Sequence, residues 1–68
     1  MKPFEVILEI TSRGRRIGRT CVHLMADSVS TAAVKAEAAV EKDYANTVSH
    51  TVKVNPLTMD EYTFITAA

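Results

Sequence analysis

The chain has 68 residues, the size of one small domain, and its eight Lys and Arg residues balance eight Asp and Glu residues. A formal net charge of zero gives the whole molecule no attraction to nucleic acid or an anionic membrane, so any electrostatic function must be local. Its single cysteine, Cys21, excludes an internal disulfide and fits a reducing compartment. Because residues 1–10 resemble neither a signal peptide nor a membrane span, we expect a cytoplasmic protein without membrane contact.

Two segments near the N-terminus alternate apolar and polar residues with the period of two that is typical of β-strands. The first spans residues 4–11 and the second spans residues 18–25. Residues 12–17 connect them, so the sequence predicts a β-hairpin. The expected inward-facing residues are Phe4, Val6, Leu8 and Ile10 from the first strand and Thr20, Val22 and Leu24 from the second.

The register of this hairpin follows from its apolar sides. Placing both apolar sides on one face requires one residue more than a plain two-residue turn at 13–14 provides. The extra residue is absorbed either by a three-residue loop at 13–15 or by a bulge near Ile17 and Gly18. On the outer face, the same register pairs Glu5 with His23 and Glu9 with Arg19.

Residues 28–45 carry apolar side chains at helical spacing and follow a good N-cap in Asp27 or Ser28. We expect this helix to end near Asn46, a residue type that tolerates the left-handed backbone of a helix cap. Charged residues between the apolar positions fit a solvated surface. The expected buried stripe is Val29, Ala33, Ala36, Val40 and Tyr44, and the expected solvated charges are Lys35, Glu37, Glu41 and Lys42.

A third strand is expected at residues 47–55, where Pro56 ends it. Residues 57–68 carry conflicting signals, because Thr58 and Glu61 have the spacing of a helical capping box whereas the segment EYTFIT favours a strand. We favour a short extended arm there, with a fourth strand as the alternative. The alternation of the third strand places Val48, His50, Val52 and Val54 on the side of the helix.

These elements predict an α+β fold, with a ββαβ domain over residues 1–56 and a C-terminal arm or extra strand over residues 57–68. A right-handed crossover from the second strand to a parallel third strand leaves a slot that the first strand fills antiparallel to both. The expected strand order is therefore 3-1-2. One helix covers one face of this three-stranded antiparallel-type sheet, and the other face contacts solvent.

Three residues carry soft ligand or nucleophile chemistry, namely Cys21, His23 and His50. The expected alternation places Cys21 and His23 outward but His50 toward the helix, so the three would not converge on one ion. A Cys-His nucleophile pair would also lack an oxyanion hole and a pocket in so small a sheet. We therefore predict no metal, no cofactor and no catalytic residue.

The stretch TSRGRRIGRT, residues 11–20, concentrates four of the eight basic residues around both glycines. Arginines at a hairpin tip can contact phosphates, but no aromatic side chain lies among them to stack on bases. The planar donor fork of arginine also suits carboxylates at protein interfaces. A protein anchor, a nucleic-acid contact and a solvated tip without function all stay open. The predicted partner-binding residues are Arg13, Arg15, Arg16, Arg19 and Lys53, with Ile7 and Met25 as apolar anchors.

The order of elements, the segment CVHLMADS before an alanine-rich helix, and the segment HTVKVNP together resemble a family of very small early proteins of tailed bacteriophages. The resemblance covers about residues 4–56 and is to the T-odd coliphage inhibitors of bacterial RNA polymerase. In that family, basic residues alternating with valine before a proline contact the polymerase. Here the matching residues 53–56 keep only Lys53, and the RGRR tip has no counterpart in the family.

The resemblance implies a non-enzymatic, phage-encoded binding protein that acts in the host cytoplasm. It would dock on a host macromolecular complex, with RNA polymerase as the first candidate and a defence complex as the second, and inhibit or redirect it. Two alternatives come from the residues themselves. One is a nucleic-acid-binding module that uses the arginine-rich hairpin, and the other is a structural homodimer formed through residues 57–68.

Overall fold

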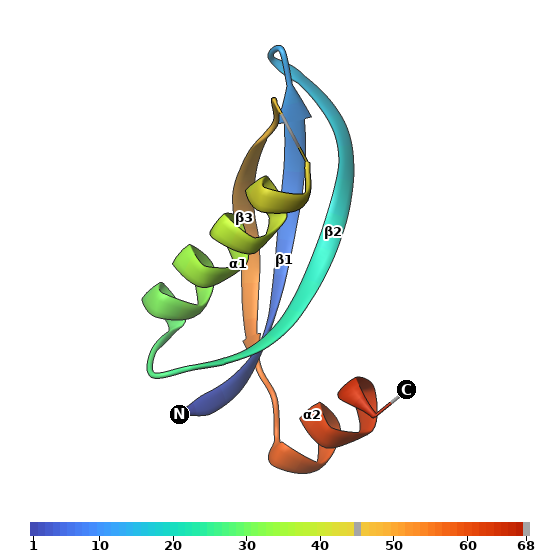
Figure 1. The fold of residues 1–68 in the computed structure, drawn as a ribbon. Helices are drawn as coiled ribbons and strands as arrows, with labels where there is room; N and C mark the ends of the chain where they lie inside the picture. The colour runs from blue at the N-terminus through green and yellow to red at the C-terminus, as the bar shows by residue number, and fades with distance from the viewer. Residues whose placement is uncertain (45, 68) are drawn as a thin grey trace.

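The computed structural model describes residues 1–44 and 46–67. Its three strands form one antiparallel sheet in the order β2-β1-β3, with β1 in the centre (Figure 1). The predicted order 3-1-2 names the same neighbours from the opposite edge. The chain is a small α+β domain with two helices instead of the single helix that we predicted. The elements are β1 (Lys2–Ser12), β2 (Arg15–Ala26), α1 (Val29–Asp43), β3 (Val48–Pro56) and α2 (Met59–Thr66).

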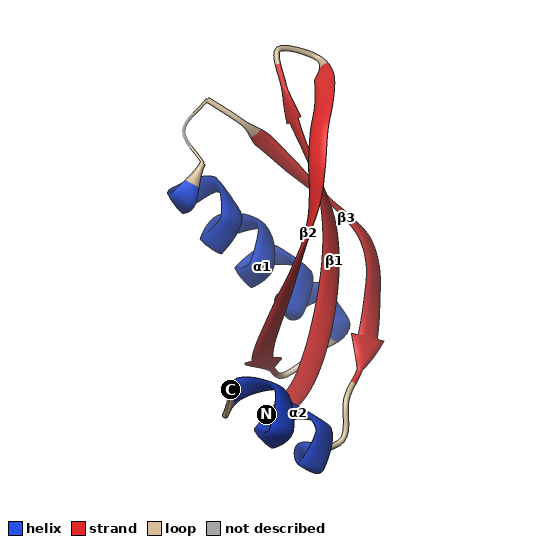
Figure 2. Cartoon of the chain, turned by 90° about the vertical axis from the view of Figure 1, so that its right-hand side faces the viewer, coloured by secondary structure: helices blue, strands red, loops and turns tan. Residues whose placement is uncertain are grey.

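The hydrophobic core lies between α1 and one face of the sheet (Figure 2). The alternation predicted for β1 is confirmed, and Val6 and Leu8 are fully buried. On the helix, small side chains one turn apart allow the close approach of α1 to the sheet. The buried core consists of Phe4, Val6, Leu8, Ile10, Ala26, Ala32, Ala36 and Val40, with Val22, Leu24 and Val54 packed against it.

The predicted buried stripe of the helix is only partly right. Ala36 and Val40 are buried, but Val29 is 54% exposed and Tyr44 is 48% exposed, because both lie at the ends of α1. Ser28 is the N-cap, and its hydroxyl accepts a hydrogen bond from the backbone N–H of Thr31 at 3.2 Å. The helix ends at residue 43, before the predicted end near Asn46, but Asn46 has the predicted left-handed backbone with a φ of 61°. Residue 45 lies outside the described residues.

A bulge absorbs the extra residue of the β1–β2 hairpin. The predicted register holds from Phe4 opposite Leu24 to Ile10 opposite Gly18, and it shifts by one residue beyond that point. Ile17 is the extra residue, so the bulge alternative is confirmed and the three-residue loop is wrong. The turn has two residues, 13 and 14, whose φ angles are 55° and 77°. Positive φ at both positions is typical of the type I′ turn that matches the twist of a hairpin.

β3 departs from the alternation that we predicted. The register of its pairing with β1 shifts by one residue, which leaves Val52 without a partner opposite it. Val54 packs against the core as predicted. In residues 48–51, before the bulge, the residues predicted to face the helix lie on the opposite side of the sheet, and their neighbours face the helix instead. The predicted helix-side positions of Val48 and His50 are therefore wrong. Both residues are exposed, and Ser49 is buried instead.

Hydrogen bonds between α1 and β3 explain why polar residues replace valines at this interface. The backbone N–H of Thr51 donates to Glu37 Oε2 at 3.1 Å, and its hydroxyl donates to the same oxygen at 2.8 Å. The Ser49 hydroxyl donates to Glu41 Oε2 at 3.2 Å and contacts the Glu37 carbonyl oxygen at 3.3 Å. The solvated role predicted for Glu37 and Glu41 is therefore only partly right: Glu41 is exposed and Glu37 is half-buried, but both bind the edge strand.

The C-terminal segment forms a helix, so the predicted extended arm and the alternative fourth strand are both wrong. Thr58 and Glu61 make a capping box, in which Glu61 N–H donates to the Thr58 hydroxyl at 3.1 Å and Thr58 N–H donates to Glu61 Oε1 at 2.8 Å. This reciprocal cap prevails over the strand propensity of EYTFIT. The backbone N–H of Leu57 donates to the Pro3 carbonyl oxygen at 3.0 Å, and α2 contacts β1 and β2 at that end of the sheet (Figure 1).

We expect Glu37→Ala to lower the free energy of unfolding by roughly 1–2 kcal/mol, because two donors of Thr51 would lose a charged acceptor. Chemical denaturation monitored by circular dichroism measures this change. Val34→Ala, at a position of α1 that is 67% exposed, is the matched control and should change stability by less than about 0.5 kcal/mol. Equal stability of the two variants would contradict the structural role of Glu37.

Candidate functional site

The sheet face opposite α1 brings several of the predicted site residues together, and we call it the open face. Its side chains alternate with the core residues of each strand. Core packing therefore determines which side chains face outward. The open face consists of Glu5, Ile7 and Glu9 of β1, Arg19, Cys21, His23 and Met25 of β2, and His50, Lys53 and Asn55 of β3.

Near the hairpin, two arginines share one carboxylate oxygen. Arg19 Nη2 donates to Glu9 Oε2 at 2.9 Å, and Arg16 Nη1 donates to the same oxygen at 3.3 Å. The predicted pairing of Glu9 with Arg19 is confirmed. The hydrogen bond from Arg19 holds the pKa of the Glu9 carboxyl below its usual value, and Arg16 lowers it further. Two guanidinium groups on one carboxylate leave this end of the open face with excess positive charge.

The other two arginines of the hairpin lie beyond this ion pair. Arg13 and Arg15 are exposed at the turn, and within the described residues neither has an acidic partner in hydrogen-bond range. Arg13 has a φ of 55°, a left-handed conformation that costs an ordinary L-residue about 1–2 kcal/mol. Asparagine or glycine would adopt this conformation more easily. The turn therefore presents two unneutralised guanidinium groups, one of them at a strained backbone position.

The remaining predicted anchors lie along the open face. Ile7 is half-buried in the centre, opposite Cys21 on one side and Lys53 on the other. Met25 lies at the far end, opposite Pro3 and close to the end of the sheet that α2 contacts. The predicted residues are therefore spread over the length of the sheet. A shallow depression of the surface in its central part is lined by Glu5, Ile7, Arg19, Thr20 and Cys21.

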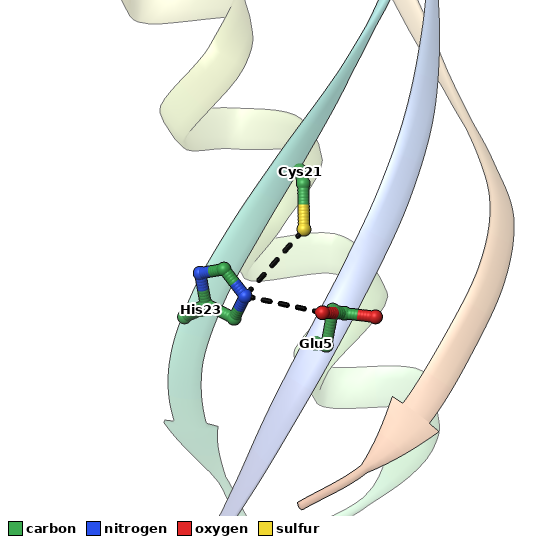
Figure 3. A group of neighbouring side chains, drawn as sticks. All are labelled: Glu5, Cys21 and His23. Carbon is green, nitrogen blue, oxygen red and sulfur yellow. Dashed lines mark hydrogen bonds and ion pairs between the residues drawn. The ribbon is translucent and has the colours of Figure 1, made fainter. Parts of the chain in front are cut away.

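A second group of side chains was not predicted as a site. Figure 3 shows Glu5, Cys21 and His23 pointing toward one another from β1 and β2. His23 Nε2 lies 3.2 Å from Glu5 Oε2 and 3.6 Å from Cys21 Sγ. One oxygen, one sulfur and one nitrogen atom of these residues all lie within 4.8 Å of one another. Three potential electron-pair donors therefore converge on one point of the open face.

The surroundings act differently on the two acidic groups of this cluster. The Asn55 amide donates to Glu5 Oε1 at 3.2 Å, and this bond together with His23 lowers the pKa of the Glu5 carboxyl. Burial and the nearby Glu5 carboxylate raise the pKa of the Cys21 thiol. A thiolate at Cys21 is thus disfavoured while Glu5 carries its charge. A cation between the two groups would remove that conflict.

The signal for this cluster in the sequence is usable but incomplete. The hairpin register already placed Glu5 opposite His23, with Cys21 two residues away on the same side. Cysteine and histidine alone do not identify the cluster, because its third donor is a carboxylate. His50 does lie apart from the cluster, but the reason we gave is wrong, because it is on the open face opposite Glu9.

Among known proteins, no protein-family model, no curated protein and no solved structure matches the chain. In residues 1–44 and 46–67, neither helix has the length and apolar character needed to cross a membrane. Function must therefore be inferred from the open face and the hairpin.

The strained turn generates a prediction about stability. We expect Arg13→Asn to raise the free energy of unfolding by up to about 1 kcal/mol, because asparagine tolerates the left-handed region better. Gly14→Ala should lower it by about 1 kcal/mol, although a Cβ there would meet no heavy atom within 4 Å, since φ is +77°. Thermal and urea unfolding of both variants test this. A stabilised Gly14→Ala variant would contradict the type I′ turn.

Proposed function

We propose that this chain is a non-enzymatic binding protein that docks through its open face and hairpin on an acidic patch of a host protein complex. The observation that carries this proposal is the segregation of charge within a neutral chain. Six of the eight basic residues lie in the sheet and its hairpin turn. Six of the eight acidic residues lie in the two helices and the loop before α1.

Because of this segregation, a chain with a net charge of zero can still be attracted to a charged partner. The sheet and its turn carry an excess of basic residues, and the helices with the loop before α1 carry an excess of acidic residues, so the field of a charged partner can orient the chain before contact. The basic residues are concentrated at the hairpin, where Arg13 and Arg15 are exposed. An acidic protein surface is the partner that this arrangement favours.

The chemistry of the hairpin supports a protein partner over a nucleic acid. Arginine forms bidentate bonds with carboxylates, and its flat group packs well at interfaces. Base recognition in single strands relies on aromatic stacking platforms, whereas Phe4 is buried in the core and the other aromatic residues lie in α2 or at the end of α1. The apolar centre at Ile7 adds a contact that a phosphate backbone would not use.

The resemblance to small phage inhibitors supports a choice of target. On that basis we propose a bacteriophage protein that acts in the cytoplasm of its bacterial host and inhibits or redirects RNA polymerase, with a defence complex as the second candidate. In the family, the end of the third strand contacts the polymerase. By this resemblance Lys53, which lies on the open face opposite Ile7, would make that contact, and the arginine hairpin would extend it.

We expect an Arg13→Glu, Arg15→Glu double variant to bind purified bacterial RNA polymerase at least about tenfold more weakly than the unchanged chain, a loss of about 1.4 kcal/mol or more. Both arginines lie outside the Glu9 ion pair, so the fold should persist. Biolayer interferometry at two salt concentrations, with a promoter-directed transcription assay, measures binding and inhibition.

The matched control is Lys35→Glu with Lys42→Glu, which changes the net charge equally but on α1. Equal weakening by both double variants would contradict a docking role for the hairpin. If the unchanged chain does not bind RNA polymerase, the proposal of that enzyme as the target is wrong. Salt-labile binding to any DNA or RNA, measured in parallel, would support the nucleic-acid alternative instead. Sedimentation of the free chain tests the homodimer alternative, for which α2 offers Phe64, 82% exposed.

A further inference from the structure

We propose that Glu5, Cys21 and His23 bind one divalent ion of the zinc class, with a fourth coordination position open to solvent on the open face. This inference goes beyond the docking function and stands independently of it. It rests on the convergence of three different donor atoms, which Figure 3 shows between the two neighbouring strands.

Two of the three distances between the donor atoms match those of a tetrahedral zinc site. Zinc bonds of about 2.3 Å to sulfur, 2.0 Å to nitrogen and 2.1 Å to oxygen imply separations of about 3.6 Å for sulfur and nitrogen and about 3.4 Å for nitrogen and oxygen. The observed separations are 3.6 Å from Cys21 Sγ to His23 Nε2 and 3.2 Å from His23 Nε2 to Glu5 Oε2. The sulfur of Cys21 and a carboxylate oxygen of Glu5, the third pair, lie within 4.8 Å of each other.

The identity of the donors selects the kind of ion. Thiolate and imidazole suit zinc and related transition metals, whereas magnesium and calcium require several oxygen ligands and here find one carboxylate. A divalent charge would also compensate the carboxylate of Glu5 and a thiolate at Cys21, which repel each other without a cation. Three protein ligands leave one position for water or for a donor atom of whatever binds the open face.

The fold holds these ligands in place and leaves them accessible. Glu5 is directly opposite His23 in the register, and Cys21 is opposite Ile7, the next outward residue on β1. The side chains of His23 and Glu5 are 25% and 29% exposed, so an ion can reach them from solvent. The Asn55 amide donates to the other carboxylate oxygen of Glu5 at 3.2 Å, which orients the ligand as outer hydrogen bonds do in metal sites.

Titration of the purified chain with cobalt(II), with the cysteine kept reduced, tests this proposal. We expect one ion per chain, a thiolate-to-cobalt charge-transfer band and the intense visible bands of a tetrahedral ion, all lost when zinc is added. Cys21→Ser should abolish the charge-transfer band. His23→Gln and Glu5→Gln should each weaken cobalt binding by at least about tenfold, because direct ligands matter at least as much as their outer hydrogen bonds.

His50→Gln is the matched control, since it removes the other histidine of the open face and should leave cobalt affinity unchanged. Circular dichroism of each variant shows whether it is folded. If one of the three ligand variants does not fold, the other two still test the proposal. A weak octahedral spectrum without the charge-transfer band would overturn the proposal, as would unchanged affinity of Cys21→Ser or one ion per two chains. The test needs no partner protein, so its failure is distinct from failure of the docking proposal.

Discussion

The pairing of β1 on both of its edges is the constraint from which the rest of the structure follows. A central strand has no freedom to slip, because a shift by one residue would turn its apolar side chains into solvent. Phe4, Val6 and Leu8 therefore face α1, and Glu5 and Glu9 must face outward. The outward residues of β2 and β3 are then placed opposite them by the register alone.

Two bulges adapt the neighbouring strands to this constraint, and each has a consequence for the surface. The bulge at Ile17 allows a two-residue turn that exposes two arginines beyond the Glu9 ion pair. The bulge at Val52 moves His50 to the open face and turns Ser49 toward α1. The proposed docking surface and the proposed metal site therefore share one face, and β1 positions both.

How much was predictable differs between the elements for physical reasons. The strong alternation of β1 and β2 predicts which residues of each strand face α1. Placing both apolar sides on one face also requires one extra residue in the hairpin, but the sequence alone does not show where it lies. β3 alternates valine with small polar residues, so its pattern suits either side. Only the contacts with Glu37 and Glu41 on α1 decide, and these depend on tertiary structure. In α2, the capping box was a local signal that should have outweighed strand propensity. The proposed metal site becomes predictable only when the carboxylate of Glu5 is considered together with the sulfur and imidazole ligands.

The placement of side chains on the open face is tested most directly by nuclear Overhauser effects in solution, with His50 as the reporter. Its ring protons should show effects to the side chain of Glu9, while the β protons of Ser49 should show effects to Glu37 and Glu41 of α1. Effects from the His50 ring to the methyl groups of Val40 would contradict the account, because the open face would then lack the residues from which its functions are argued.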